Sequence, residues 1–82
     1  MKELLHAIVS HIVDEPDKIQ INEIAGSTTD IIEILVTKND LGKVIGKQGK
    51  TAHSIRNIVY AASFKTGKRY SVDINSFEDV EK

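Results

Sequence analysis

Apolar residues near the start of the chain recur at steps of three and four positions. They are Met1, Leu4, Leu5, Ile8, Val9, Ile12 and Val13. This spacing places them on one stripe of an α-helix, so the segment is predicted to form an amphipathic helix. Pro16 lacks an N–H group and pushes Glu15 out of helical geometry. The helix is therefore predicted to end near Val13 or Asp14.

The pattern then changes from helical spacing to strict alternation. Ile19 and Ile21 alternate with polar neighbours, as expected of a half-buried strand, and residues 25–30 are of turn-forming types. Residues 31–37 alternate again and predict a second strand. One face of it carries Ile32, Ile34 and Val36, and the other carries Ile31 and Leu35. With a turn between them, the two strands are predicted to pair as an antiparallel hairpin.

Two helical patterns and a further strand complete the chain. Residues 41–45 predict a short helix, capped by Asn39 or Asp40 and ended by Gly46. A longer helix is predicted after Gly49 and ends at Gly67. Its inward positions are Ala52, Ile55, Ile58, Val59 and Ala62. The alternating segment 70–75 predicts the third strand.

These elements predict an α+β fold in which a three-stranded sheet is covered on one face by helices. The order is helix, strand, strand, short helix, long helix, strand. Residues 1–76 are expected to form one domain, because the chain has only 82 residues. Residues 77–82 are expected to be a polar, acidic and frayed tail, with Phe77 as a candidate anchor.

Composition narrows the functional classes. The chain contains no cysteine, which excludes disulfides and thiolate metal sites and fits a cytoplasmic protein. No apolar run reaches membrane-spanning length, so no membrane association is expected. The GKT at residues 49–51 matches the end of a phosphate-binding P-loop, but Val44 stands where its first glycine is required. No catalytic constellation, metal site or cofactor motif is predicted.

The charges are segregated along the chain. Residues 38–69 contain eight basic residues and one acidic residue, a net charge of +7, whereas the rest contains three basic and eleven acidic residues, a net charge of −8. Such asymmetry indicates an anionic partner for the central segment, although a solvated lysine-rich surface gives the same pattern.

The centre of this basic segment is a loop with glycines at positions 46 and 49. Glycine tolerates positive φ and removes the side chain that would hold a ligand away from the backbone. The first turn of the following helix leaves N–H groups unpaired, and these attract phosphate oxygens. Lys47 and Gln48 at the tip are expected to contact a sugar-phosphate chain. Lys43, Lys50 and Arg56 are expected to add positive charge.

The loop and its surroundings resemble a known signature. The residues concerned run from Val44 through Gly46, Lys47, Gln48 and Gly49 to Lys50 and continue with Ala52, Ile55 and Arg56. They are similar to the VIG-x-x-G signature of the KH domain, and the element order αββααβ resembles the type II arrangement. Nearly the whole chain resembles the KhpA family of small stand-alone bacterial KH proteins. Ala52 departs from the pattern, because many KH domains have a larger aliphatic residue there.

The resemblance implies function as well as fold. It implies a non-catalytic protein that binds single-stranded RNA, with residues 46–49 clamping the phosphates of about four nucleotides. Ile45, Ala52, Ile55 and the edge of the second strand would line an apolar groove for bases, with Val36 as a weaker candidate. The family further implies RNA chaperone activity, post-transcriptional regulation and a link to cell elongation, cell shape and cell wall biogenesis. A second, KhpB-like KH protein is an implied partner.

A protein-interaction module is the alternative interpretation. In that case the long helix would pair with a second copy, giving a homodimer, or with another KH protein, and RNA binding would be secondary. Tyr60 and Phe64 lie four positions apart on this helix and either complete the core, which the spacing favours slightly, or form an oligomer contact. Dimerisation and RNA binding are compatible, because a dimer contacts twice as many nucleotides.

Overall fold

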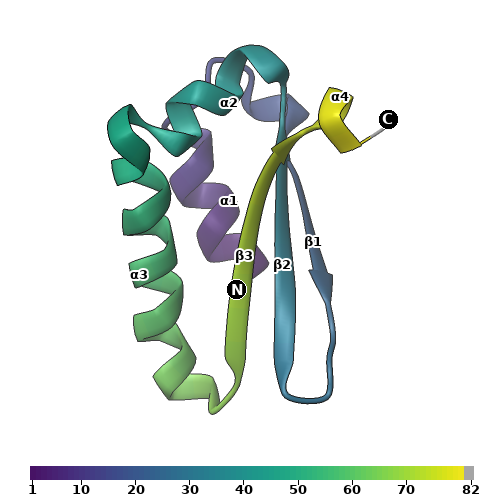
Figure 1. Cartoon of the computed structure of the whole chain (residues 1–82), viewed down its shortest axis with the longest axis vertical. Helices are drawn as coiled ribbons and strands as arrows, with labels where there is room; N and C mark the ends of the chain where they lie inside the picture. Colours follow the sequence, from purple (N-terminus) through teal and green to yellow (C-terminus); the bar gives the residue numbers. More distant parts are fainter. Residues whose placement is uncertain (81–82) are drawn as a thin grey trace.

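The computed structural model describes residues 1–80, with side chains up to Glu78, as two layers. The elements are α1 (Lys2–Ser10), the 3-10 turn η1 (Pro16–Lys18), β1 (Gln20–Ile24), β2 (Thr29–Val36), α2 (Lys38–Ile45), the 3-10 turn η2 (Lys47–Gly49), α3 (Lys50–Thr66), β3 (Arg69–Ser76) and α4 (Phe77–Val80). Helices α1, α2 and α3 lie on one side of the sheet (Figure 1). The predicted α+β class and the predicted element order are confirmed.

The sheet has the strand order β1-β2-β3. β1 and β2 form the predicted antiparallel hairpin, in which Ile21 pairs with Ile34. β3 runs parallel to β2, from the pair Thr29–Arg69 to the pair Val36–Ser76. A parallel neighbour requires a crossover, and α2 and α3 provide it. β2 is therefore the central strand, and β3 is the edge strand beside α3 (Figure 1).

The core lies between the helices and one face of the sheet. Its buried members are Leu5, Val9, Val13, Ile21, Ile32, Ile34, Val36, Val44, Ile55, Val59 and Val72. The alternation of β2 determines this face, because residues two apart point to the same side of a strand. On the other face Leu35 is buried, but Ile31 is 38% exposed and so is only partly covered.

The first helix is shorter than predicted. α1 ends at Ser10, and a turn continues to Val13, whose N–H donates to Val9 O at 3.1 Å. The N–H groups of Asp14 and Glu15 then donate to the Asp40 carboxylate instead of to helical carbonyls. The contact with Asp40, which is distant in sequence, therefore ends the helical hydrogen bonding before Pro16.

Two further boundaries differ from the prediction. The first strand begins at Gln20, after the Pro16–Lys18 turn, so Lys18 and Ile19 precede it. The short helix begins at Lys38, and its N-cap is Thr37, whose hydroxyl accepts the Asp40 N–H at 3.3 Å. The predicted caps Asn39 and Asp40 are wrong, because both residues lie inside the first turn of α2.

The start of the predicted polar tail forms a short helix. α4 forms directly after β3, and Phe77 at its start is half-buried, as the predicted anchor requires. Residues 81 and 82 of the predicted tail lie outside the described residues. Within residues 1–80, no helix combines the length and the apolar character needed to cross a membrane.

Candidate nucleic-acid interface

The loop between α2 and α3 depends on the backbone conformation of Gly46. This residue has φ 78° and ψ 170° and ends α2 by donating its N–H to Gly42 O at 2.8 Å. A Cβ atom placed on Gly46 would lie 2.3 Å from Thr51 Oγ1 and 2.8 Å from the Thr51 backbone N. Both the positive φ and the close approach of Thr51 therefore require glycine.

The tip of the loop is a tight left-handed turn. Gln48 has φ 58° and Gly49 has φ 75°, and the Gly49 N–H donates to Gly46 O at 3.1 Å. This conformation directs the side chains of Lys47 and Gln48 outward, and both are exposed. A non-glycine residue such as Gln48 at positive φ is uncommon and indicates a constrained turn.

The N-terminus of α3 opens onto this turn. Its N-cap is Gly49, so no side chain accepts a hydrogen bond from the first N–H groups of the helix. The Lys50 N–H donates to Lys47 O, but the following N–H groups of the first turn and the aligned peptide dipoles of the 17-residue helix produce partial positive charge at the loop. The backbone alone therefore provides an anion-binding environment.

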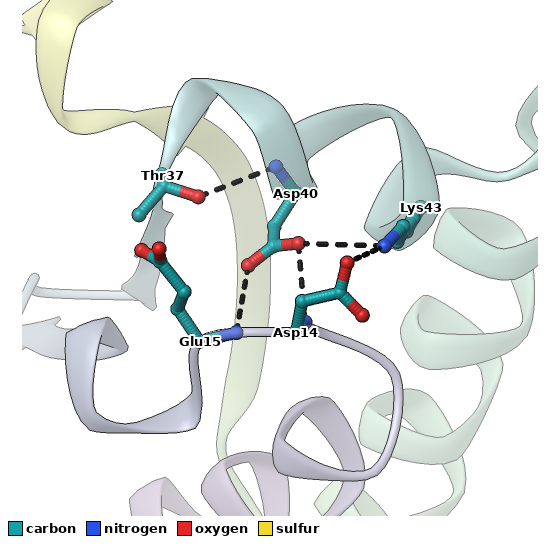
Figure 2. A network of polar contacts seen from close by, with 5 residues as sticks. All are labelled: Asp14, Glu15, Thr37, Asp40 and Lys43. Carbon is teal, nitrogen blue, oxygen red and sulfur yellow. Dashed lines mark hydrogen bonds and ion pairs between the residues drawn. The ribbon is translucent and has the colours of Figure 1, made fainter.

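The lysines around the loop differ in how far their charges are balanced. Lys47 and Lys50 are exposed, and neither forms an ion pair with a residue that the structure describes. Lys43 instead contacts the Asp14 carboxylate and lies 3.8 Å from Asp40 Oδ1 (Figure 2). Lys47 and Lys50 consequently offer more uncompensated charge to a phosphate than Lys43 does.

Asp40 joins the helix that precedes the loop to the N-terminal part of the chain. Its side chain is 2% exposed and accepts the Asp14 and Glu15 N–H groups, each at 3.1 Å (Figure 2). A buried carboxylate is tolerated only when it is hydrogen-bonded and paired, and here Lys43 provides the pairing. Asp40 therefore fixes the position of α2, and with it the position of the glycine loop.

The pKa values of this network follow from its contacts. Burial alone raises the pKa of Asp40, but the N–H groups of Asp14 and Glu15, the Thr37 side chain and the positive Lys43 outweigh burial and leave it below 3.8. The hydrogen bond to Asp14 raises the pKa of Lys43 above 10.5. The Asp40 contribution to stability is thus present at neutral pH and is lost as the pH falls through its lowered pKa.

Comparison with known proteins identifies the family of this chain. Residues 2–74 match the family described as KhpA/KhpB, KH domain. The chain belongs to this KH-domain family. The αββααβ order of its core is that of a type II KH domain, as the sequence predicted.

Several curated relatives are similar over nearly their whole length. RNA-binding protein KhpA of Caldanaerobacter subterraneus subsp. tengcongensis is 49% identical over 74 residues, which cover 90% of this chain and 99% of the relative. The proteins of the same name from Clostridium acetobutylicum and Chlamydia trachomatis are 46% and 38% identical, and the aligned residues cover 99% and 95% of them. The resemblance to the KhpA family seen in the sequence is confirmed.

The residues predicted to line an apolar groove in this KH domain differ in their exposure. Ile45 is 37% exposed, whereas Ala52 and Ile55 are 4% and 1% exposed and belong to the packed interior. The edge of the second strand cannot line a groove, because β2 is the central strand, and Val36 is buried at 1%. The predicted edge position of the second strand was wrong, because sequence alternation shows the faces of a strand but not its neighbours.

The strand edge that lies beside α3 in this KH domain belongs to β3, one of the two edge strands of the sheet. Arg56 extends from α3 toward it, and its Nε and Nη2 donate to Val72 O at 3.4 and 3.3 Å. His53 and Arg56 help to line a hollow of about 410 Å³ between α3 and β3. The sequence indicated Arg56 as a cation and predicted the third strand, but it did not show that the two are neighbours, because only the crossover places β3 beside α3.

Tyr60 and Phe64 do not complete the core of the KH domain, which is the interpretation that their spacing slightly favoured. Their side chains are 66% and 72% exposed, and the rings contact each other edge to face with centroids 5.0 Å apart. The inward stripe of α3 is already filled by Ala52, Ile55 and Val59. Among the described residues, no group of three His, Asp or Glu side chains is arranged to hold a metal ion.

Proposed function

We propose that this chain is a non-catalytic RNA-binding protein that holds the backbone of single-stranded RNA at the loop formed by residues 46–49. The phosphates approach the open N-terminus of α3, and Lys47 and Gln48 lie along the sugar-phosphate chain. Lys50 adds charge directly beside the loop. Lys43 and Arg56 contribute less, because each has a partner within the protein.

The observation that carries this proposal is the backbone of the loop. Two glycines at positive φ flank an exposed lysine and an exposed glutamine, and the following helix has no side-chain cap. This is the form of a GXXG loop, which clamps about four nucleotides of an unpaired strand. The relatives that carry the name RNA-binding protein KhpA support the choice of RNA as ligand.

The apolar contacts to bases are proposed at the side of the loop. Ile45 has an exposed portion that a base can cover, whereas Ala52 and Ile55 can form only the floor beneath it. A small residue at position 52 keeps that floor shallow. Such a site contacts few base edges, so we expect modest affinity and weak sequence preference.

The cellular role is proposed from family membership. A protein that holds unpaired RNA weakly can act as an RNA chaperone or post-transcriptional regulator in the cytoplasm. We extend this proposal to the control of cell elongation, cell shape and cell wall biogenesis, in partnership with a KhpB-like KH protein. The family description, which joins KhpA and KhpB, supports that pairing.

The decisive experiment changes the loop tip without changing the fold. The double variant Lys47→Asp, Gln48→Asp is titrated against a short single-stranded oligouridylate, with binding followed by fluorescence anisotropy. The expected loss of affinity is about tenfold or more, because two repulsive charges then face the phosphates. Circular dichroism verifies that the variant is folded.

A matched control exists elsewhere on the surface. Lys18 and Gln20 are exposed and lie outside the basic segment, so Lys18→Asp, Gln20→Asp introduces the same charges at a distance from the loop. This control is expected to bind almost as well as the wild type. Equal affinities for the loop variant and the control would refute the clamp.

The exposed apolar side chains of α3 support a second candidate function. Tyr60 is 66% exposed and Phe64 is 72% exposed, although both belong to a helix that packs on the sheet. Covering them against a second copy or another KH protein removes apolar surface from water. Sedimentation at micromolar concentration tests self-association, and a monomer that retains full RNA binding would count against a homodimer.

A further inference from the structure

The face of the sheet that points away from α1, α2 and α3 is here called the outer face. Its residues are Gln20, Asn22 and Ile24 of β1, Thr29, Ile31, Glu33 and Leu35 of β2, and Arg69, Ser71, Asp73 and Asn75 of β3. None of the three long helices covers it, and α4 lies on the other side of the strands from α3 (Figure 1). The outer face is therefore the side of the sheet on which the fold leaves room for a further layer.

The outer face is closed at one end and open at the other. At the end next to α4, Leu35 pairs with Asn75 and is 5% exposed. Toward the turn between β1 and β2, Ile24 and Ile31 are 53% and 38% exposed. These two isoleucines are direct cross-strand partners, so they form one apolar patch instead of two isolated side chains.

Two carboxylates lie next to this apolar patch. Glu33 and Asp73 are register partners on β2 and β3, so their side chains leave the same face of neighbouring strands. Asn22 Nδ2 donates to Glu33 Oε1 at 3.1 Å, but neither carboxylate forms an ion pair with a described residue. Like charges on adjacent strands repel each other, and a cation from a partner would remove this repulsion.

The charge of the outer face differs between its two ends. Of the outer-face residues, all of which the structure describes, only Arg69 is basic, and it pairs with Thr29 at the corner beside the turn. Four residue positions, or about 13 Å along the strand, separate Arg69 from Asp73. Glu78 in α4 is exposed and adds negative charge near the opposite end. The region around the two carboxylates is therefore acidic.

From this arrangement we propose that the outer face is a docking surface for a basic amphipathic helix of another protein. An apolar side chain of that helix covers Ile24 and Ile31. Its lysine or arginine side chains pair with Glu33 and Asp73. The glycine loop lies in the helical layer on the other side of the sheet, so this surface is separate from the proposed RNA clamp and does not depend on it (Figure 1).

The spacing of the outer-face residues matches the repeat of a helix. Ile31 and Glu33 are two positions apart on β2, a distance of about 6.6 Å along the strand. Residues i and i+4 of a helix lie on one side of it, about 6 Å apart along the axis. A helix that follows β2 can therefore place an apolar residue over Ile31 and a basic residue, one turn away, over Glu33.

Charge selects the class of partner. A nucleic acid would bring its phosphates toward Glu33 and Asp73 and would be repelled. A second copy of this chain has its basic residues in the segment 38–69, which contains the glycine loop. Its contact with the outer face would be head-to-tail, which repeats without closing. A helix from a different, basic protein meets neither obstacle, and contact between copies is the competing outcome of the test.

A model peptide provides a direct test in the unmodified protein. The probe is a helical peptide of about four turns, made of leucine and lysine with leucines three and four positions apart, and the control probe has glutamate in place of lysine. The lysine peptide is expected to shift the amide NMR signals of residues 20–24, 29–35 and 71–75, whereas the glutamate peptide is not. A uridine tetranucleotide, which the loop accommodates, is expected to leave the peptide affinity unchanged.

Removal of the two carboxylates tests the charged part of the surface. The double variant Glu33→Gln, Asp73→Asn is expected to bind the lysine peptide about fivefold more weakly, because two exposed ion pairs are lost. The matched control is Glu3→Gln, Asp17→Asn, which removes the same charge at exposed positions outside the outer face. It is expected to bind the peptide almost as well as the wild type.

The apolar patch is tested in the same way. The double variant Ile24→Thr, Ile31→Thr keeps β-branched side chains that favour a strand, and it is expected to lose about fivefold in peptide affinity because apolar contact is lost. Ile58→Thr is the matched control, because Ile58 is 40% exposed but lies on α3. It is expected to bind the peptide normally.

Four results would overturn the docking surface. The lysine peptide could fail to bind, its shifts could lie outside the outer face, or the carboxylate variant could bind it as well as its control does. The isoleucine variant could also differ from the wild type only in sedimentation, which would identify a contact between copies. Tetranucleotide binding is measured separately, so its failure in the wild-type protein would refute the RNA clamp and leave the docking surface standing.

Discussion

The two ends of α3 expose different kinds of chemical group. At its N-terminus the groups proposed to face RNA are mainly backbone N–H groups, positioned by Gly46 and Gly49 at positive φ. At its C-terminus the exposed groups are side chains, among them the Tyr60–Phe64 pair and Arg69, which line a hollow between α3 and β3. The N-terminal end is therefore defined by its backbone conformation, and the C-terminal end is defined by its exposed side chains.

This difference predicts how each end tolerates change. The loop end is constrained by steric contact with Thr51 and by the buried Asp40, so substitutions there alter stability and binding together. Tyr60 and Phe64 at the other end are 66% and 72% exposed, so substitutions there should have little effect on folding. The following predictions test this contrast, beginning with the largest expected effect.

Gly46→Ala is expected to cause the largest loss. The new methyl group would collide with Thr51, and φ 78° is unfavourable for alanine, so we expect a loss of about 3 kcal/mol in the free energy of unfolding. RNA affinity should fall as well, because the loop must move to relieve the collision. Urea unfolding and anisotropy measure the two effects.

Gly42→Ala is the matched control for Gly46→Ala. Gly42 lies inside α2, and nothing lies within 4 Å of a Cβ placed there. Alanine favours the helix, so this variant should gain up to about 1 kcal/mol in stability. Equal losses for the two variants would show that the conformation of Gly46 is not a special requirement.

Asp40→Asn tests the contact that holds α2 in place. The substitution keeps the size of the side chain but removes the charge and one acceptor for the Asp14 and Glu15 N–H groups. We expect the melting temperature to fall by about 10 °C. Asp17→Asn at an exposed position in η1 should change it very little, and a similar decrease in both variants would contradict the proposed role of Asp40.

The pH dependence of stability in the wild type and in Asp40→Asn provides a further test of the Asp40 contact. Because the pKa of Asp40 lies below 3.8 in the folded protein, its stabilisation is present at neutral pH and is lost as the pH falls through that lowered value. Wild-type protein should therefore lose more stability than Asp40→Asn between about pH 5 and about pH 2. Parallel urea midpoints over this range would argue against a charged Asp40.

Gly67→Ala addresses the backbone at the opposite end of α3. Gly67 has φ 72°, but a Cβ there would meet no atom within 4 Å, so only the conformational cost applies. We expect a loss of about 1 kcal/mol, smaller than for Gly46→Ala, without a change in tetranucleotide binding. A loss as large as that of Gly46→Ala would show that the two ends are equally constrained.

The smallest expected effect is a difference between two lysines near the loop in how much each contributes to the salt dependence of RNA binding. Lys50→Ala removes a charge without a described partner and should reduce the salt dependence of log affinity by about 0.7, the value for one phosphate of a single strand. Lys43→Ala should reduce it less, because Asp14 and Asp40 already balance that charge. Binding is measured across a series of salt concentrations, and equal slopes would place both lysines on the RNA.

The sequence by itself determined the features that depend on local chemistry. Periodicity predicted the order of helices and strands, and Gly46, Gly49 and Gly67 marked the ends of helices because these positions require positive φ. The spacing of the glycines and lysines around the loop was sufficient to suggest a KH domain. Each of these signals lies within a few residues of the feature that it specifies.

Only the tertiary structure decided which elements are neighbours. The crossover made β2 the central strand, so Val36 does not lie at an edge of the sheet. It also placed β3 beside α3, which created the hollow lined by Tyr60 and Tyr70. Asp40 binds the backbone of Asp14 and Glu15, more than twenty residues away, instead of capping its own helix. Such contacts depend on the packing of the whole chain, and no local pattern of residues specifies them.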